Sequence, residues 1–282
     1  MAIDKATTRL SDLAKLWQRV RGQTLKDAKY RYTRLIAIAE RLDDPLYVDF
    51  TGPMFAEYRI QRITEVSIST VNHETRYLRA MFNELIRLEF IDHNPIKNIR
   101  TFTERETELG YLDEREIKVL FEQLEKSTNP SVYWVAKICL STGARWGEAE
   151  KLKWSNLIHK PYPALRYVDT KNGKNRTVKI APDLMAELRM NGLFSEPDHR
   201  MFKNCRTAFR YAVKKTGIKF PEQQNTHILR HTYASHFLMK GGDIFVLQRI
   251  LGHSDIKTTM RYSHFSPQYL DQAVEFSIGG II

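Results

Sequence analysis

Apolar residues recur at helical spacing along most of this 282-residue chain, and two stretches break that period. This pattern favours a mainly helical protein. In the first hundred residues it predicts four helices, which are expected over Leu10–Val20, over 24–42 with a cap at Thr24, from Thr51 with Pro53 in the first turn, and from a cap at Ser69 to about Leu88.

The second half is expected to contain helices around one β-hairpin. Asp113, with Glu116 three residues on, is typical of a capped helix start. Residues 164–180 alternate apolar and polar side chains, and Asn172-Gly173 is a strong hairpin turn signal. The other helices are expected over 113–127, Ser131–Thr142, 182–190, 200–215, 227–240, Ile244–Leu251 and 254–262.

A polar, charged segment after Asn94-Pro95 divides these two halves. We therefore predict a helical domain over 1–96, a linker over 97–108, a mixed α/β domain with a small β-hairpin or sheet over 109–264, and a tail over 265–282. The apolar side chains of the tail suggest that it docks, either on its own domain or on a neighbouring subunit.

The charge of the chain indicates a polyanionic partner. The net charge is +11, with 18 Lys and Arg against 16 Asp and Glu in residues 1–108, and 26 against 17 in residues 109–282. A basic second half favours nucleic acid binding. The sequence has no apolar run long enough to span a membrane, no apolar core of a secretory signal, and only two cysteines, so we expect a cytoplasmic protein without a membrane partner.

Six residues of the second half carry reactive or charged groups in recurring local motifs. Each alone suits a structural or solvated role, but together they form a chemically coherent set. The six are Arg145 in STGARWGEAEKLKW, Lys171 at the hairpin turn, His227 and Arg230 in THILRH, His253 in ILGHSD and Tyr262 in TTMRYSH.

The order and spacing of these motifs resemble the tyrosine recombinases of the phage integrase type. The run GGDIFVLQRILGHSDIKTTMRYSH is similar to that family throughout, and the chain as a whole most resembles integrases of P2-like temperate phages. The resemblance spans about residues 109–265, and the helical first hundred residues are more loosely similar to the family's core-binding (SAM-like) domain. It implies a site-specific recombinase in which two domains form a C-shaped DNA clamp.

The chemistry of DNA strand exchange suits these residue types. Arg145 and Arg230 can bind the non-bridging oxygens of a phosphodiester and stabilise charge in the transition state. His227, one helical turn before Arg230, can donate to the same phosphate or handle a proton, and His253 is a further donor. Tyr262 is the expected nucleophile, with a pKa lowered by nearby positive charge.

The resemblance adds further roles. Attack by Tyr262 would give a 3′-phosphotyrosine and a 5′-hydroxyl, and Lys171 would protonate the leaving oxygen. Lys174 is the competing lysine, and Lys171 is preferred because it lies just before the turn. Glu148 either orients an arginine or the histidine, or is only a salt-bridge partner within its helix.

The expected partner is double-stranded DNA with inverted core sites, bound by a homotetramer on two duplexes. Host DNA-bending proteins and excisionases are candidate accessory partners in a nucleoid-associated protein. No cofactor and no metal are expected, because two arginines supply the charge stabilisation. Many phage integrases carry an arm-binding N-terminal domain; no room for one is expected before Thr8, so it is either absent or removed.

Two other functions fit part of the pattern. A type IB topoisomerase-like enzyme shares the arginines, lysine, histidine and tyrosine, but needs no pairing of two DNA sites. A non-catalytic DNA-binding regulator would have no need of Tyr262. A covalent DNA adduct separates enzyme from regulator, and exchange between two sites separates recombinase from topoisomerase.

Overall fold

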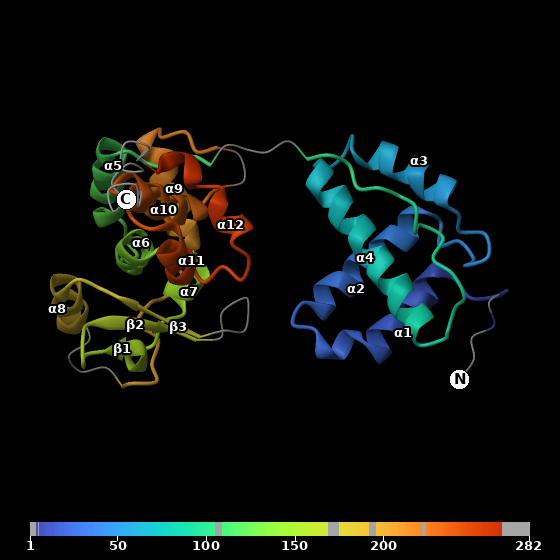
Figure 1. Ribbon diagram of the computed structural model, residues 1–282, viewed down its shortest axis with the longest axis horizontal. Helices are drawn as coiled ribbons and strands as arrows, with labels where there is room; N and C mark the ends of the chain where they lie inside the picture. The colour runs from blue at the N-terminus through green and yellow to red at the C-terminus, as the bar shows by residue number, and fades with distance from the viewer. Residues whose placement is uncertain are drawn as a thin grey trace, which may run out of the picture. The chain divides into compact units, whose positions relative to one another are not determined.

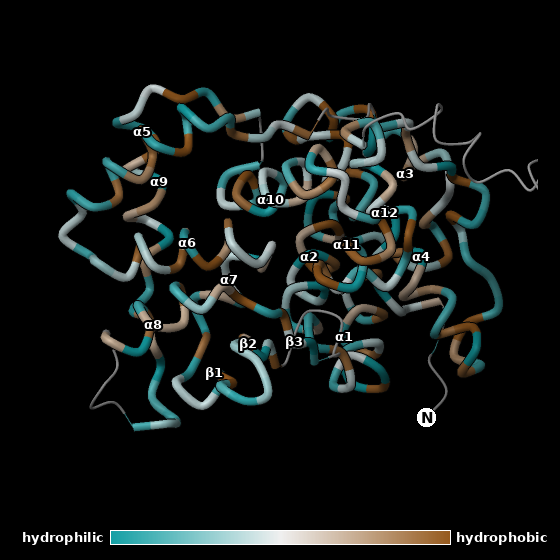
Figure 2. Tube along the Cα trace, turned by 60° about the vertical axis from the view of Figure 1, so that its left-hand side comes forward, coloured by the Kyte–Doolittle hydropathy of each residue, from teal (hydrophilic) through white to brown (hydrophobic). Residues whose placement is uncertain are grey.

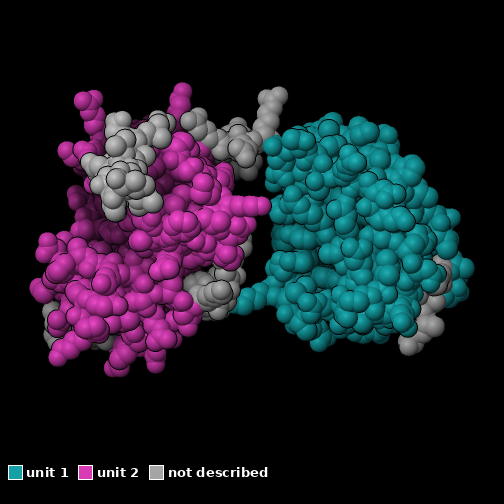
Figure 3. Space-filling model, viewed as in Figure 1, with its two compact units in different colours: residues 1–106 teal, residues 107–282 magenta. Residues whose placement is uncertain are grey.

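The chain forms two compact units, residues 1–106 and 107–282, each described here by itself (Figure 3). The computed structural model describes residues 4, 6–104, 109–168, 175–191, 196–221 and 224–266. Among these residues, no helix combines the length and apolar content needed to cross a lipid bilayer.

Unit 1 is a helical bundle. Its elements are α1 (Leu10–Val20), the 3-10 helix η1 (Gly22–Thr24), α2 (Ala28–Arg41), α3 (Gly52–Arg62) and α4 (Ile68–Arg87) (Figure 1). The tube coloured by hydropathy shows hydrophobic and hydrophilic residues alternating along α1 and α4 (Figure 2). The hydrophobic residues meet in one core that includes Trp17, Leu35, Phe50 and Phe82.

Two predicted helix starts in unit 1 are wrong by a few residues. The second helix begins at Ala28, because residues 22–24 turn as a 3-10 helix and Asp27 occupies the N-cap position. The fourth is capped by Ser67 rather than Ser69, since the Ser67 hydroxyl accepts the backbone N–H of Thr70 at 3.3 Å. The cap at Thr51 is confirmed.

Residues 97–104 of the predicted linker lie against unit 1. The side-chain amide of Asn72 donates to the carbonyl of Phe102 at 2.9 Å and accepts its N–H at 2.8 Å. The guanidinium of Arg59 lies 3.9 Å from the centre of the Phe102 ring. The division between the units falls at residues 106 and 107, inside the predicted linker.

Unit 2 consists of helices and one small sheet. The elements are α5 (Glu114–Glu125), α6 (Ser131–Thr142), α7 (Trp146–Glu150), η2 (Trp154–Asn156), β1 (Leu157–Ile158), β2 (Ala164–Tyr167), β3 (Arg176–Lys179), α8 (Pro182–Asn191), α9 (Arg206–Thr216), α10 (His227–Met239), α11 (Ile244–Leu251), α12 (Lys257–Met260) and η3 (Ser263–Phe265). The sheet lies at one end of the unit beside α8, and α5, α9 and α10 lie at the other (Figure 1).

The sheet is antiparallel in the order β1-β2-β3. The expected pairing of its last two strands is confirmed, with Leu165 opposite Val178 and Tyr167 opposite Arg176. The predicted turn, which carries Lys171 and Lys174, lies outside the described residues. Strand β1 was not expected, because two residues are too few to show an alternating pattern.

One predicted helix start in unit 2 agrees with the structure, and two predicted helices are shorter than expected. The capping box of Asp113 and Glu116 is confirmed. The helix expected over 200–215 begins only at Arg206, because the preceding residues run alongside 152–154, where the N–H of Met201 donates to the carbonyl of Leu152. The helix expected over 254–262 is reduced to α12, and Tyr262 lies between α12 and η3.

Candidate active site

Arg145 is presented by a tight turn between α6 and α7. Helix α6 ends at Gly143, which has a φ of 65°, a left-handed conformation that favours glycine. A Cβ atom there would lie 2.6 Å from Cδ1 of Tyr233, so the close packing of α10 also excludes a side chain. The turn formed by the sequence Thr-Gly-Ala-Arg therefore fixes the backbone position from which the Arg145 side chain extends.

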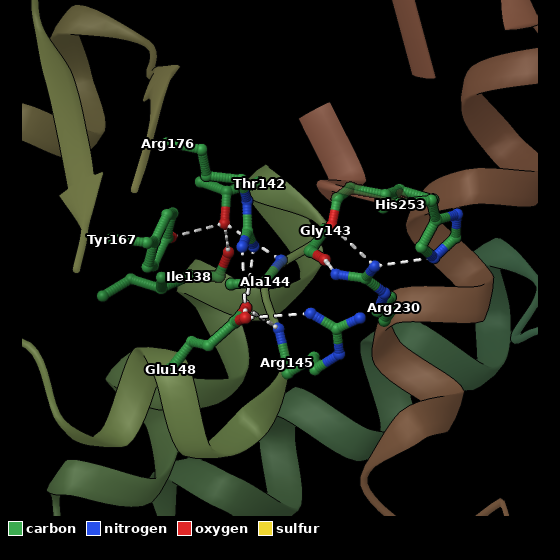
Figure 4. Close-up of polar contacts among 11 residues, drawn as sticks. Ile138, Thr142, Gly143, Ala144, Arg145, Glu148, Tyr167, Arg176, Arg230 and His253 are labelled. Atoms are coloured by element: carbon green, nitrogen blue, oxygen red, sulfur yellow. Dashed lines mark hydrogen bonds and ion pairs between the residues drawn. The ribbon is translucent and has the colours of Figure 1, made fainter. Parts of the chain in front are cut away.

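Glu148 joins Arg145 to a second arginine, Arg176 of β3 (Figure 4). Its Oε1 accepts from Nη1 of Arg145 at 3.0 Å and from Nη1 of Arg176 at 3.1 Å. Its Oε2 accepts from the backbone N–H of Arg145 at 2.9 Å and from Nη2 of Arg176 at 2.7 Å. Burial raises the pKa of this carboxyl, but the hydrogen bonds and charge of Arg176 and Arg145 outweigh it and lower the pKa to about 2.

Arg230 lies in α10 with its side chain only 3% exposed. Its Nη1 donates to the carbonyl of Gly143 at 2.8 Å, and its Nη2 donates to the carbonyl of Leu251 at 2.7 Å and contacts Nε2 of His253 at 2.8 Å (Figure 4). Burial, followed by the charges of Arg145 and Arg176, lowers the pKa of Arg230 to about 9. The group is still cationic at neutral pH.

His253 follows Gly252, which ends α11 with a φ of 67°. Because a guanidinium has no acceptor, Nε2 of His253 accepts from Arg230, and Nδ1 donates to Oγ1 of Thr259 at 2.8 Å. Burial and the charges of Arg230, Arg145 and Arg176 lower the pKa of His253 to about 4. In this arrangement the imidazole is neutral and aims a lone pair, not an N–H, at Arg230.

Tyr262 is 3% exposed and packs in a cluster with Leu109, Leu247 and Leu251. Its hydroxyl lies 2.6 Å from Nδ1 of His231. The expectation of a lowered pKa is wrong for this state, because burial raises the pKa of Tyr262 more than Arg230, Arg261 and Arg145 lower it.

His231 is itself a perturbed group beside this tyrosine. Burial, followed by the charge of His227 and of two arginines, lowers the pKa of His231 to about 4. Its ring centre lies 6.3 Å from that of His227. His231 is therefore neutral around pH 7 and can share a proton with the phenol.

His227 is exposed and borders a cavity of about 930 Å³ that Arg145 and Glu148 also line. The structure thus joins Arg230 and His253 through a short contact, and places Arg145 close enough for its charge to lower the pKa of both. His227 lies at the cavity beside Arg145. Tyr262 contacts His231 and lies near enough to Arg230 and Arg145 for their charges to act on its pKa. Lys171 lies outside the described residues.

Three residues at this site were not anticipated from the sequence: Arg176, His231 and Thr259. The spacing of His227 and His231 places both on one face of α10, which was an available signal. The contact of Arg176 with Glu148 joins positions 28 apart in the chain and has no local signature.

Among the described residues, no group of three or more His, Cys, Asp or Glu side chains could hold a metal ion. Arg145, Arg176 and Arg230 all contribute to lowering the pKa of His253, so the three guanidinium groups are close to one another.

Comparison with known proteins gives two family matches. Residues 110–268 match the phage integrase family, and residues 6–103 match the phage integrase N-terminal domain. The chain belongs to the phage integrase family. This integrase is a tyrosine-type site-specific recombinase of phage integration, as its motifs predicted.

The relatives of the integrase include enzymes of P2-like phages. It is 43% identical to the integrase of Escherichia phage 186 over 279 residues, covering 95% of this chain and 81% of the relative. It is 34% identical to the integrase of Escherichia phage P2 over 274 residues, covering 95% and 77%. The predicted resemblance to P2-like integrases is confirmed.

Solved structures agree with this assignment. The catalytic domain of bacteriophage HP1 integrase is 43% identical, with a TM-score of 0.55, and the match covers 61% of this chain and 98% of that domain. A lambda integrase (75–356) dimer bound to a core site has a TM-score of 0.75 at 19% identity, covering 93% of this chain and 97% of that one, and shows a shared fold.

Proposed function

We propose that the integrase cleaves DNA by attack of Tyr262 on a phosphodiester held by Arg145 and Arg230. One observation carries this proposal: the neighbouring guanidinium groups of Arg145, Arg176 and Arg230 are accompanied by one carboxylate, Glu148, which binds the first two of them. No other described carboxylate forms an ion pair with Arg145, Arg176 or Arg230. The surplus positive charge suits a bound phosphate, whose non-bridging oxygens gain charge as the nucleophile attacks.

The reaction forms one bond and breaks one. Oη of Tyr262 bonds to phosphorus, its proton passes to an acceptor, and the 5′-oxygen of the next nucleotide leaves with a proton from Lys171. Nδ1 of His231 is the acceptor nearest at hand, 2.6 Å from Oη. The product is a 3′-phosphotyrosine, and a 5′-hydroxyl of another strand can reverse the step without ATP.

The two remaining histidines act on the phosphate. His227 faces the cavity beside Arg145 and can donate to a phosphate oxygen there. His253 must change its hydrogen bond with Arg230 before it can donate from Nε2. An arriving phosphate favours that change, because it offers Arg230 a charged acceptor and raises the pKa of the imidazole.

Tyr262 needs to move before it can attack. With 3% of its surface exposed, the ring is covered by the apolar cluster around Leu247 and Leu251. The connection from α12 through Tyr262 to η3 consists of two short helical segments, and a local shift of this connection would free the ring.

The assembly follows from the same proposal. Residues 1–96 and 109–264 would clamp double-stranded DNA at inverted core sites, with 97–108 as the linker, and four copies would act on two duplexes. A lambda integrase with this fold forms a tetramer on a Holliday junction, which supports the proposal. The tail 265–282 would join neighbouring subunits, and host DNA-bending proteins and excisionases would control the direction of the reaction.

Arginine variants test the proposal. Arg145→Ala and Arg230→Ala should each slow single-turnover cleavage about a hundredfold or more, while DNA affinity changes far less. Replacing a non-bridging oxygen of the scissile phosphate by methyl removes the charge that these arginines stabilise. On this substrate the difference in cleavage rate between the wild type and each arginine variant should therefore be smaller. A variant that cleaves at the wild-type rate, or a defect that the neutral substrate leaves unchanged, contradicts the role.

A further inference from the structure

The cavity beside Arg145 extends well beyond the residues that the proposed reaction uses. Its volume of about 930 Å³ is much larger than a single phosphate group requires. Five more cationic side chains line it, and these are Lys151, Lys153, Arg200, Arg206 and Arg210. The only carboxylate among its lining residues is Glu148, which is already bound to two arginines.

The five cations are largely without protein counter-charges. Among the described residues, Lys151, Arg200, Arg206 and Arg210 form no ion pair, and Lys153 has one partner, Asp198, at 3.6 Å. Asp198 is 88% exposed, so that pair contributes little. Like charges gathered around one cavity repel each other, and an external anion would relieve the repulsion.

The backbone holds these side chains around the cavity. Arg206 and Arg210 are four residues apart on α9, so they lie on one face of that helix. The rings of Trp146 and Phe209 pack 4.8 Å apart and fix α7 against α9. A Cβ atom on Gly147 would lie 3.8 Å from Nη2 of Arg206, so this guanidinium lies over the first turn of α7, next to Arg145.

Backbone pairing also holds the part of the cavity lining that contains Lys153 and Arg200. Lys153 and Arg200 are paired by an antiparallel β-bridge, and the N–H of Trp154 donates to the carbonyl of His199. Arg206 and Arg210 thus line the cavity from α9, and Lys153 and Arg200 line it from this bridged pair of segments. A ligand with several charges in a row fits this distribution better than a compact anion.

We propose that Lys151, Lys153, Arg200, Arg206 and Arg210 bind the backbone phosphates that adjoin the scissile phosphate on the cleaved strand. The inference rests on the proposed function, which places the scissile phosphate at Arg145. It adds a direction: from Arg145 the strand runs over α7 and along the exposed face of α9 that carries Arg206 and Arg210.

Charge-neutral variants of α9 test this path. Arg206→Gln/Arg210→Gln is compared with Lys214→Gln/Lys215→Gln, which removes the same charge from the same helix outside the cavity. Fluorescence anisotropy measures affinity for core-site DNA across a salt series. Loss of two phosphate contacts should reduce the slope of log affinity against log salt by about two, while the control variant changes it less.

A substrate scan locates the contacts. Methylphosphonates are placed singly at the two phosphates on either side of the scissile one. At least one of these methylphosphonates should lower the affinity of the wild type for DNA. The same methylphosphonate should not lower the affinity of Arg206→Gln/Arg210→Gln any further. The inference is overturned if the two double variants show equal slopes of log affinity against log salt. It is also overturned if the affinity lost in Arg206→Gln/Arg210→Gln and the affinity lost with the methylphosphonate add at every position. Binding is measured without cleavage, so failure of the catalytic proposal shows separately as wild-type protein that binds but forms no covalent product.

Discussion

At the scale of single residues, the negative charge of Glu148 needs an explanation, because a carboxylate would repel the phosphate that we propose the site binds. Arg176 balances this negative charge. Arg176 binds both oxygens of Glu148, so the carboxylate orients Arg145 without cancelling its charge. Arg176 also lies 4.7 Å over the ring of Tyr167, which fixes its position.

This balance predicts the effect of removing Arg176. In Arg176→Gln, Glu148 is left to neutralise Arg145 alone, and cleavage should slow about tenfold, equivalent to about 1.4 kcal/mol of transition-state stabilisation. In Arg176→Gln/Glu148→Gln the opposing charge is gone as well, so the rate should recover towards the wild type. Single-turnover cleavage at saturating protein measures both.

A purely structural role for Arg176 gives a different result. The double variant would then be at least as slow as the single one, because two buried hydrogen-bonding groups would be lost instead of one. Thermal unfolding of each variant separates loss of fold from loss of rate.

Several site residues could be predicted from the sequence because their motifs are local. Arg145 follows the Thr-Gly-Ala turn, and His253 follows the glycine that ends α11. The raised pKa of Tyr262 could not be predicted in this way, because it depends on the depth of burial, which only the packed structure determines. The contact of His231 with Tyr262 could not be predicted either, because the two residues lie 31 positions apart, although the spacing of His231 from His227 was an available signal.

At the scale of elements, strand β3 connects two parts of the site. Its first residue, Arg176, bonds to Glu148 at the start of α7, and Gly252 lies against the same side chain. Strand β3 is thus held close to Arg145 at its first residue.

The hairpin lysine gives the second prediction. Lys171→Ala should slow cleavage of an ordinary phosphodiester, because the 5′-oxygen then leaves without a proton donor. A 5′-bridging phosphorothiolate should largely restore the rate, since a thiolate is a good leaving group without protonation. Lys174→Ala is the control and should show neither defect nor rescue; the opposite pattern would assign proton donation to Lys174.

Element boundaries were predicted best where the cap is a side chain close in sequence. Asp113 and Thr51 are of this kind. The helix expected from residue 200 fails because these residues pair with 152–154, a contact across almost fifty residues that competes with helix formation. Helix α7, with five residues, is shorter than the window in which a helical period can be seen.

At the scale of the whole molecule, the excess positive charge of the second half has a structural counterpart in the cavity of unit 2. The mainly helical fold with one hairpin could be predicted, because the sequence shows both the helical spacing of apolar residues and the alternation of apolar and polar residues that is typical of strands. The convergence of separate segments on Arg230 was not, because the carbonyls of Gly143 and Leu251 that bind it carry no sequence signal.

Stability should depend on pH through His231 and His253. Both have a pKa of about 4 in the folded protein, below the ordinary value of 6.5, so the unfolded chain binds more protons between these values. The two neutral histidines should therefore make their whole contribution to the free energy of unfolding above pH 6.5. This contribution should fall as the pH drops towards 4. The loss is at most about 1.4 kcal/mol per unit of pKa displacement, and solvent screening at half-buried His253 reduces it.

Urea unfolding at pH 7 and pH 5 measures this loss. His253→Gln and His231→Gln each remove one titrating group, so each should make stability less dependent on pH over this window. An unchanged dependence in both variants would mean that other groups cause it.

The identity of the nucleophile is tested most directly by isolating the covalent product. Wild-type protein is incubated with a nicked suicide substrate that loses the 5′-hydroxyl strand, then digested, and the DNA-bearing peptide is sequenced by mass spectrometry. We expect the nucleotide on Tyr262, linked through a 3′-phosphate, and no covalent product from Tyr262→Phe, which should still bind DNA because only a hydroxyl is lost. A nucleotide on another residue such as Tyr233, or an adduct that persists in Tyr262→Phe, would contradict the account.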